Sequence, residues 1–272
     1  MCTLTFIPRN NGYYLAMNRD ERISRGLAAP PARIELEETS AIFPRDVEGG
    51  TWIAANDLGL GFALLNWNDV ISNGEKLLKT RSRGFVIQDV VHLRSLDQVQ
   101  GRLNLLDLTG ILPFRLVGVF PANKQLWEWR WDMSTLKADT HSWDLRHWFS
   151  SSLSDKQAAL RRGIACHAAW QDERAGTLRW TRKLHRSHAG GAGPFSLCVH
   201  RENVRTVSYT ELISTPEKVE CNYLPGSPCR AEGIEQSVSI ERILLAPVFN
   251  VREPQKSYCG NSFVSSLSRS TT

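Results

Sequence analysis

The chain has 272 residues, of which 42% are hydrophobic and 22% charged, and this composition predicts a folded globular protein. The formal net charge is +5, but the basic residues are not interleaved with a stacking platform or a known binding motif, so we do not expect nucleic-acid binding. No apolar stretch approaches the roughly 18–20 residues that span a bilayer, and the first residues lack the features of a secretory signal. We therefore expect a cytoplasmic protein without integral membrane association.

The cysteines are widely spaced and none forms a Cys-x-x-Cys pair: Cys2, Cys166, Cys198, Cys221, Cys229 and Cys259. This spacing fits a reducing compartment and does not indicate a zinc or redox site. Cys221 and Cys229 bracket a Pro-Gly-rich loop and would pair only in an exported protein. Two further pairs of residues raise the question of metal or haem: Cys166 with His167, and His185 with His188. Without a second ligand cluster at a recognised spacing, we expect no metal and no cofactor.

The chain begins with a predicted β-hairpin. Residues 2–7 alternate as a strand, Asn10-Asn11-Gly12 is a strong turn signal, and residues 13–17 resume the strand. A hairpin returns its second strand to the start of its first. The segment Asn18-Arg19-Asp20-Glu21 is therefore expected beside Cys2, so that the two features form one candidate site.

The remaining elements suggest a layered α+β domain. A polar loop with Pro30, Pro31 and Pro44 is expected between the hairpin and Gly49. Strands are predicted near residues 51–55, 60–67, 114–120, 126–132, 136–142, 195–200 and 204–209, and helices at 83–93, 95–107 and 154–170. A basic, solvated loop is predicted at Arg179, Arg182, Lys183, His185, Arg186 and His188. We expect one domain over residues 1–264 and a flexible tail over residues 265–272.

Three tryptophans, Trp127, Trp129 and Trp131, alternate along a predicted strand and therefore project from one face. Such a stripe more often forms core beneath a helix layer. The alternative is a pocket for an apolar acyl chain or a flat macrocycle.

Cys2 follows the initiator methionine directly, which gives it a specific chemical capacity. Removal of Met1 would place a thiol, with a pKa of about 8.5, and an α-amine, with a pKa of about 7.7–8.0, on one residue. The amine can then accept the thiol proton, and no histidine is required. The alternative is that residue 2 is simply small enough to permit methionine removal.

A set of short motifs accompanies Cys2 in order: Asn18-Arg19-Asp20-Glu21, Ser24-Arg25, Gly49-Gly50-Thr51-Trp52, Leu64-Leu65-Asn66 and Arg83-Gly84. Together with the Met-Cys start, this series resembles the NRDE family, also called the transport and Golgi organisation protein 2 family. The chain departs from the family pattern at Gly26, where a proline commonly follows Ser-Arg. The family in turn resembles N-terminal-nucleophile (Ntn) hydrolases. This resemblance implies an α+β fold, a four-layer αββα sandwich with the nucleophile on the first strand.

The resemblance also implies roles for individual residues. Cys2 would attack a carbonyl, Asp20 would orient the amine, Arg19 would neutralise Asp20 or position the substrate, and Asn66 would donate to the oxyanion. The expected substrate-binding residues are Asn18, Glu21, Arg25, Trp52 and Arg83. The structural alternatives are a buried Arg19–Asp20 ion pair, a turn capped by Asn66 and a solvated charge cluster.

The predicted function is acyl transfer or hydrolysis of a linear amide or thioester, and the predicted partner is a small acylated amine. The alternative is a non-catalytic carrier of haem, acyl-CoA or lipid built on the same scaffold. The presence of both Cys2 and Asp20 favours the enzyme, whereas the tryptophan stripe favours the carrier.

Overall fold

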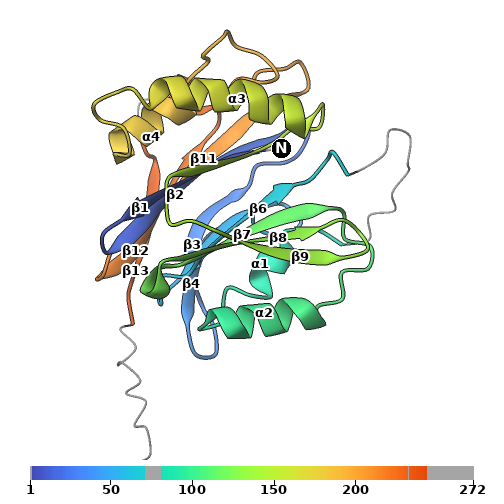
Figure 1. The fold of residues 1–272 in the computed structure, drawn as a ribbon, viewed down its shortest axis with the longest axis vertical. Coiled ribbons are helices and arrows are strands. Elements are labelled where there is room, and N and C mark those ends of the chain that lie inside the picture. Colours follow the sequence, from blue (N-terminus) through green and yellow to red (C-terminus); the bar gives the residue numbers. More distant parts are fainter. Residues whose placement is uncertain (1, 71–80, 232, 244–272) are drawn as a thin grey trace, which may run out of the picture.

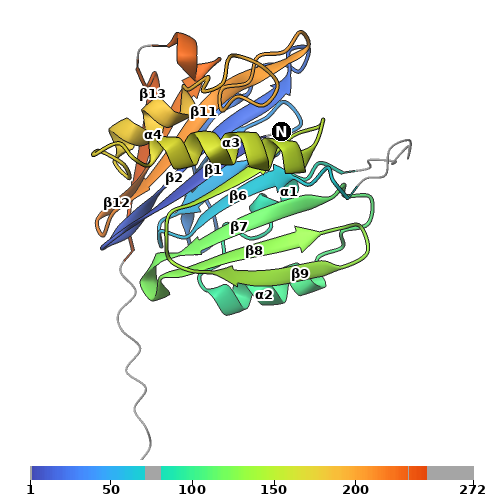
Figure 2. The ribbon, with the colours of Figure 1, turned by 45° about the horizontal axis from the view of Figure 1, so that its top comes forward.

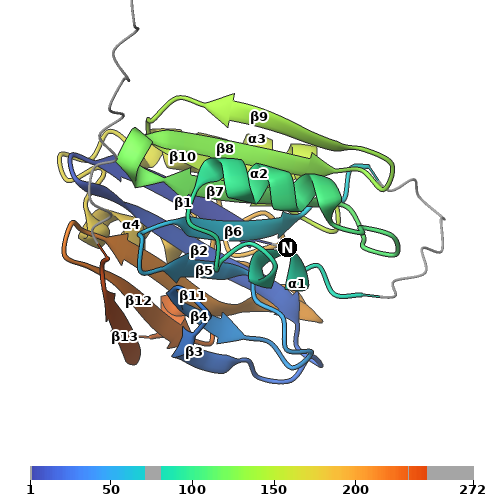
Figure 3. The ribbon, with the colours of Figure 1, turned by 90° about the horizontal axis from the view of Figure 1, so that it is seen from below.

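A computed structural model describes residues 2–70, 81–231 and 233–243 of the chain. Two antiparallel sheets stack face to face, and helices cover the outer face of each (Figure 1). Helices α3 and α4 lie over the six-stranded sheet, whereas α1 and α2 lie over the seven-stranded sheet, as Figures 2 and 3 also show. The expected α+β fold with four αββα layers is confirmed.

The six-stranded sheet has the order β10-β1-β2-β11-β12-β13. Its strands are β1 (Cys2–Arg9), β2 (Gly12–Arg22), β10 (Arg146–Ser150), β11 (Val204–Ser214), β12 (Lys218–Pro225) and β13 (Gln236–Glu241). The seven-stranded sheet runs in sequence order through β3 (Ala29–Glu35), β4 (Ser40–Arg45), β5 (Ile53–Asn56), β6 (Gly61–Asn66), β7 (Phe114–Phe120), β8 (Gln125–Trp131) and β9 (Leu136–His141). The helices are α1 (Phe85–Gln88), α2 (Leu96–Leu105), α3 (Asp155–Ala169) and α4 (Leu178–His185), with 3₁₀ turns η1 (Pro121–Asn123) and η2 (Pro228–Arg230).

Apolar cores between the layers hold the described residues together. The first lies between the sheets and includes Leu4, Ile53 and Val117. The second lies between the seven-stranded sheet and its helices, and the third lies beneath α3 and α4. Trp129 is 2% exposed in the second core, with Trp127 and Trp131 packed against it. The tryptophan stripe is therefore core beneath a helix layer, as expected.

Two strands that contain proline were not predicted from the sequence. The predicted loop with Pro30, Pro31 and Pro44 in fact contains β3 and β4. β3 is the edge strand of its sheet, where a missing N–H costs no ladder hydrogen bond, and the β3–β4 register shifts between Ala29 and Ala32, opposite Pro44. The loop prediction was wrong because these prolines occupy the positions that a sheet tolerates.

The region after α3 also differs from the prediction. The basic segment is the helix α4, whose buried face includes His185, and not a solvated loop. Residues 195–200 form no strand and make only a single bridge, His200 to Arg205. β12 and β13 complete the six-stranded sheet instead.

Two of the predicted helix starts are confirmed by their caps. Ser95 and Ser154 each accept a hydrogen bond from the backbone N–H three residues later. Among the described helices, none is long and apolar enough to cross a membrane. The predicted tail at residues 265–272 lies outside the described residues, so the single-domain expectation stays a prediction.

Candidate active site

The alternation of β1 determines where Cys2 points. Cys2, Leu4 and Phe6 belong to the core between the sheets, whereas Thr3 and Thr5 contact Arg162 and His185 on the helix side. Cys2 is 6% exposed and lies at the end of a central strand. Its thiol is thus directed to the cleft between the two sheets.

Asp20 lies beside the chain start, as the hairpin predicted, but on the other face of the sheet. Cys2 pairs with Arg19, so Asp20 is opposite the position that precedes Cys2. The Asp20 carboxylate accepts a hydrogen bond from Thr206 Oγ1 at 2.6 Å and contacts Arg162 Nη2 at 3.4 Å. The Asp20 side chain therefore lies on the helix side of the sheet, opposite to the face that carries the Cys2 thiol.

Arg162 is the principal residue that the sequence did not reveal. It extends from α3 and is fully buried. Its Nη1 donates to the Cys2 carbonyl at 3.1 Å and to Thr3 Oγ1 at 2.9 Å, and its Nη2 pairs with Asp20. The expected Arg19–Asp20 ion pair is not the one that forms, because Arg19 shares the opposite face with Cys2.

A signal for Arg162 was nevertheless present. The buried positions of α3 are Asp155, Ala158, Arg162 and Cys166, which follow helical spacing. A charged residue within such a stripe must find a buried partner.

The two sheets enclose a polar pocket of about 90 Å³ at this end. Its lining includes nearly all of the predicted site residues: Cys2, Arg19, Asp20, Glu21, Arg25, Trp52, Asn66 and Arg83. The other lining residues are Asp46, Thr51, Leu64, Ser82 and Gly84. The motifs that were separate in the sequence are thus brought together in one cavity.

Asn18 is the exception. Its side-chain amide donates to the His185 and Leu197 carbonyls, both at 2.8 Å, on the helix side of the six-stranded sheet. Asn18 does not line the pocket and fastens α4 and the following loop to β2. The strand alternation turns Asn18 to the face opposite Arg19, so the structure does not bring it together with the other predicted site residues.

Arg19 and Arg25 form one wall of the pocket through Glu21. The Arg19 guanidinium stacks over the Trp52 ring at 4.6 Å and lies 3.7 Å from Glu21, and Arg25 lies 3.6 Å from Glu21. Arg25 also pairs with Asp46 at 3.0 Å. Burial acts to raise the Glu21 pKa, but the Arg22 N–H bond and these two arginines outweigh it and lower the pKa. This wall is a pre-arranged set of charges.

Arg83 enters the pocket because two glycine motifs pack backbone to backbone. A Cβ on Gly84 would lie 2.7 Å from the Thr51 nitrogen and 3.0 Å from the Gly50 Cα. Arg83 Nη1 donates to the Pro113 carbonyl at 3.1 Å, and burial lowers the Arg83 pKa to about 10, so the side chain stays cationic at neutral pH.

Asn66 ends β6 at the same cavity, half-buried and paired in register with Phe114. Asn66 belongs to the seven-stranded sheet and Cys2 to the six-stranded sheet, and both line the pocket.

The electrostatic environment of Cys2 combines opposing effects. In the chain that still carries Met1, burial raises the pKa of the Cys2 thiol, the amino-terminal charge and Arg19 lower it, and Asp20 raises it again. The net pKa lies above the usual value. The thiol is therefore protonated at neutral pH and requires a base before it can attack.

Comparison with solved structures gives distant similarities. Penicillin V acylase from Agrobacterium tumefaciens aligns with a TM-score of 0.48 at 12% identity over 83% of this chain and 84% of its own. A variant of the conjugated bile acid hydrolase from Clostridium perfringens aligns with a TM-score of 0.47 at 9% identity, covering 88% and 92% of the two chains. A second variant of that hydrolase has a TM-score of 0.46 at 9% identity, covering 91% and 100%.

No curated protein matches the sequence. Residues 1–155, more than half of the chain, match the sequence profile described as "Transport and Golgi organisation 2". This match includes every motif of the pocket and confirms the resemblance drawn from those motifs. The chain therefore belongs to the Transport and Golgi organisation 2 family.

Proposed function

We propose that this protein is an Ntn cysteine hydrolase that cleaves a small linear amide after Met1 has been removed. One observation carries the proposal. The Cys2 thiol opens into a pocket whose other walls supply an amide donor, Asn66, and a cation, Arg83. A nucleophile and donors for a developing oxyanion are the minimum set for acyl transfer.

The proposed reaction begins with proton transfer from the Cys2 thiol to its own α-amine. The thiolate attacks the carbonyl carbon, and the carbon–nitrogen bond then breaks as the ammonium returns its proton to the leaving amine. Water, deprotonated by the same amine, attacks the thioester and releases the acid and the thiol. The raised thiol pKa makes such an internal base necessary.

Asp20 and Arg162 have positioning roles in this proposal. Burial raises the pKa of Asp20 and Arg162 opposes that effect. Asp20 is opposite the position that precedes Cys2 in the hairpin register, so its carboxylate would orient the Cys2 amine once Met1 has been removed. Arg162 fixes the Cys2 carbonyl and therefore the backbone on which both amine and thiol are held.

The substrate class follows from the size and charge of the pocket. A volume of about 90 Å³ is below the roughly 300–1,000 Å³ typical of sites that enclose a whole drug-sized ligand. The pocket therefore accommodates the scissile group, and Arg83 favours a substrate with a carboxylate near it. N-acyl amino acids combine both features.

The test compares one polypeptide with and without a free Cys2 amine. A cleavable amino-terminal extension is fused directly to Cys2, and its removal exposes the amine without changing any side chain. We expect covalent labelling by an electrophilic amide analogue, and turnover of N-acyl amino acids, only after cleavage. Cys2→Ala should abolish both activities, and Cys166→Ala, at another buried cysteine, should preserve them. Equal labelling of the uncleaved, folded protein would contradict the proposal.

A second candidate function, a carrier of haem or an acyl chain, is favoured by a different cavity. A groove of about 630 Å³ lies between β1 and α3 and is lined by His147, Cys166, His167 and Trp170, among others. Its volume suits a larger apolar ligand. Haem titration followed by the Soret band should then show binding that is weakened by His167→Ala and unaffected by Cys2→Ala. The absence of a spectral change at micromolar haem would exclude this function.

A further inference from the structure

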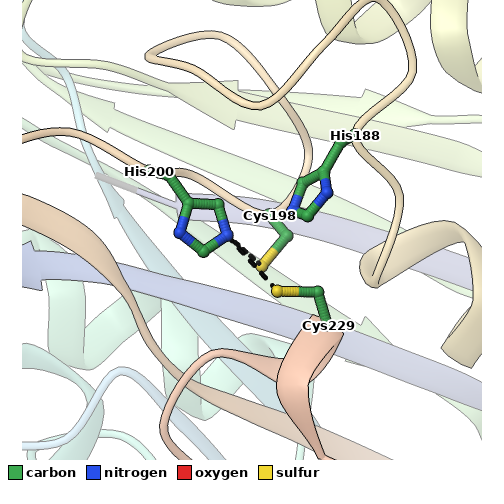
Figure 4. Close-up of side chains that lie close together, drawn as sticks. All are labelled: His188, Cys198, His200 and Cys229. Carbon is green, nitrogen blue, oxygen red and sulfur yellow. Dashed lines mark hydrogen bonds between the residues drawn. The ribbon is translucent and has the colours of Figure 1, made fainter.

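Four side chains with metal-binding atoms meet on the helix side of the six-stranded sheet, away from the pocket: His188, Cys198, His200 and Cys229 (Figure 4). One ligand atom from each lies within 4.8 Å of all the others. His200 Nε2 lies 3.7 Å from Cys198 Sγ and 3.3 Å from Cys229 Sγ. In a tetrahedral zinc site, with Zn–S of about 2.3 Å and Zn–N of about 2.0 Å, ligand atoms are roughly 3.3–3.8 Å apart. The cluster is close to this geometry without rearrangement of the backbone.

The state of each side chain is compatible with metal binding. Cys198 and Cys229 are free thiols. His188 Nε2 is buried and has no hydrogen-bond partner within the described part of the chain. The His188 and His200 rings meet edge to face, with centroids 4.9 Å apart. A buried ring nitrogen without a partner is costly, and a metal ion would remove that cost.

We propose that His188, Cys198, His200 and Cys229 bind one zinc ion. Two thiolates and two imidazoles form a donor set that zinc prefers among the divalent cations. Because four protein ligands complete the tetrahedron, the ion has no open position for substrate and its role is structural.

This proposal revises the expectation of no metal. The four ligands lie on two segments, and their separations in sequence match none of the usual paired-ligand motifs. Of the two histidines considered together, His185 bonds Thr5 Oγ1 through Nε2 at 2.9 Å and is not among the four clustered side chains, whereas His188 is. Cys221 lies in β12 within the core between the sheets, so it is not the partner of Cys229.

The zinc ion would link two segments, the loop that contains Cys198 and His200 and the turn η2, and residues of both segments form hydrogen bonds with Thr206. Val199, between two of the ligands, donates its N–H to Thr206 Oγ1 at 2.8 Å, and Ser227, beside η2, donates its hydroxyl to the Thr206 carbonyl at 2.8 Å. Thr206 in turn donates to Asp20 at 2.6 Å. The metal site is thereby linked to the carboxylate of the candidate active site through a short chain of hydrogen bonds.

The test measures metal in the full chain and does not depend on enzymatic activity. After purification under reducing conditions and dialysis, we expect about one zinc ion per chain by elemental analysis. The apo protein titrated with Co²⁺ should develop thiolate-to-cobalt charge transfer and the intense visible bands of a tetrahedral site. Cys198→Ser and His188→Ala should lose most of the zinc, and Cys166→Ala should retain it.

Three results would overturn the proposal. One is a folded wild-type protein that binds neither zinc nor cobalt stoichiometrically. Another is stoichiometric iron or copper in place of zinc. The third is a Cys198–Cys229 disulfide in the reduced preparation, detected as a loss of two hydrogens by mass. The cobalt titration uses the wild-type chain, so it tests the proposal even if a variant fails to fold.

Discussion

Replacement of Arg162 by methionine tests the central electrostatic feature of the site. Arg162 donates to the Cys2 carbonyl, Thr3 Oγ1 and the Ser150 carbonyl, and it pairs with Asp20. Methionine fills much of the same volume but leaves these acceptors and a buried carboxylate without the guanidinium. Breaking one side of a buried ion pair costs about 3–5 kcal/mol, and we expect a loss of this size in the free energy of unfolding at pH 8.

The loss should depend on pH with a definite sign. Burial already raises the Asp20 pKa in the folded protein, and Arg162 opposes that effect. Without Arg162 the folded-state pKa rises further above the unfolded value of about 3.9, so the folded state binds more protons between the two values. Stability of the variant relative to wild type should therefore fall as pH rises between the wild-type and the variant folded-state pKa of Asp20, and the loss should be smaller at pH 5 than at pH 8.

Urea unfolding at both pH values measures the effect, with Arg161→Met as the matched control. Arg161 is the exposed neighbour on the same helix, so its replacement should change stability by less than about 0.5 kcal/mol. Adding Asp20→Asn to Arg162→Met should recover about 0.5–3 kcal/mol at pH 8, because no charge is then left unpaired. A loss below about 1 kcal/mol, or one that is equal at the two pH values and not recovered by Asp20→Asn, would refute the reasoning.

The remaining predictions concern packing. Gly84→Ala should destabilise by about 1–3 kcal/mol and slow Cys2 alkylation, because its Cβ would collide with the Thr51 backbone and displace the pocket wall. Gly101→Ala, in α2 with open space around the site, should stabilise by about 0.5–1 kcal/mol in the same urea assay, and a loss there would contradict the helix. Trp129→Ala should cost about 3–5 kcal/mol while leaving the alkylation rate of Cys2 unchanged at a temperature where the variant is folded, since Trp129 packs in the core on the helix side of the seven-stranded sheet and Cys2 in the core between the sheets. A large change in that rate would mean that the two cores are coupled.

Local sequence patterns predicted those site residues that lie in the first hairpin or at the ends of strands. The turn at Asn10-Asn11-Gly12 fixes the register that sets Cys2 opposite Arg19, and the alternation within β1 then decides which face Cys2 occupies. Alternation within β2 likewise places Asn18 and Arg19 on opposite faces of the sheet. The motif alone does not show this separation, because it treats the four residues as one unit.

The unpredicted parts depend on contacts between distant segments. Arg162 is 160 residues from Cys2 in the sequence, so nothing local links them. The cluster of His188, Cys198, His200 and Cys229 joins a loop to η2 only after β11 and β12 have paired. Such arrangements are set by tertiary packing, which short-range periodicity does not describe.

The position of β1 inside its sheet dictates an order of events during biosynthesis. β1 is paired with β2 on one side and with β10 on the other, and its first residue is 6% exposed once both are in place. An aminopeptidase needs an extended, accessible end, so the proposed function requires that methionine be excised before β1 is enclosed between β2 and β10. A chain that folds with its methionine attached would therefore be locked in the uncleaved form, and recombinant preparations made faster than the host can process them should contain two species, separable by mass, of which only the shorter carries a free Cys2 amine.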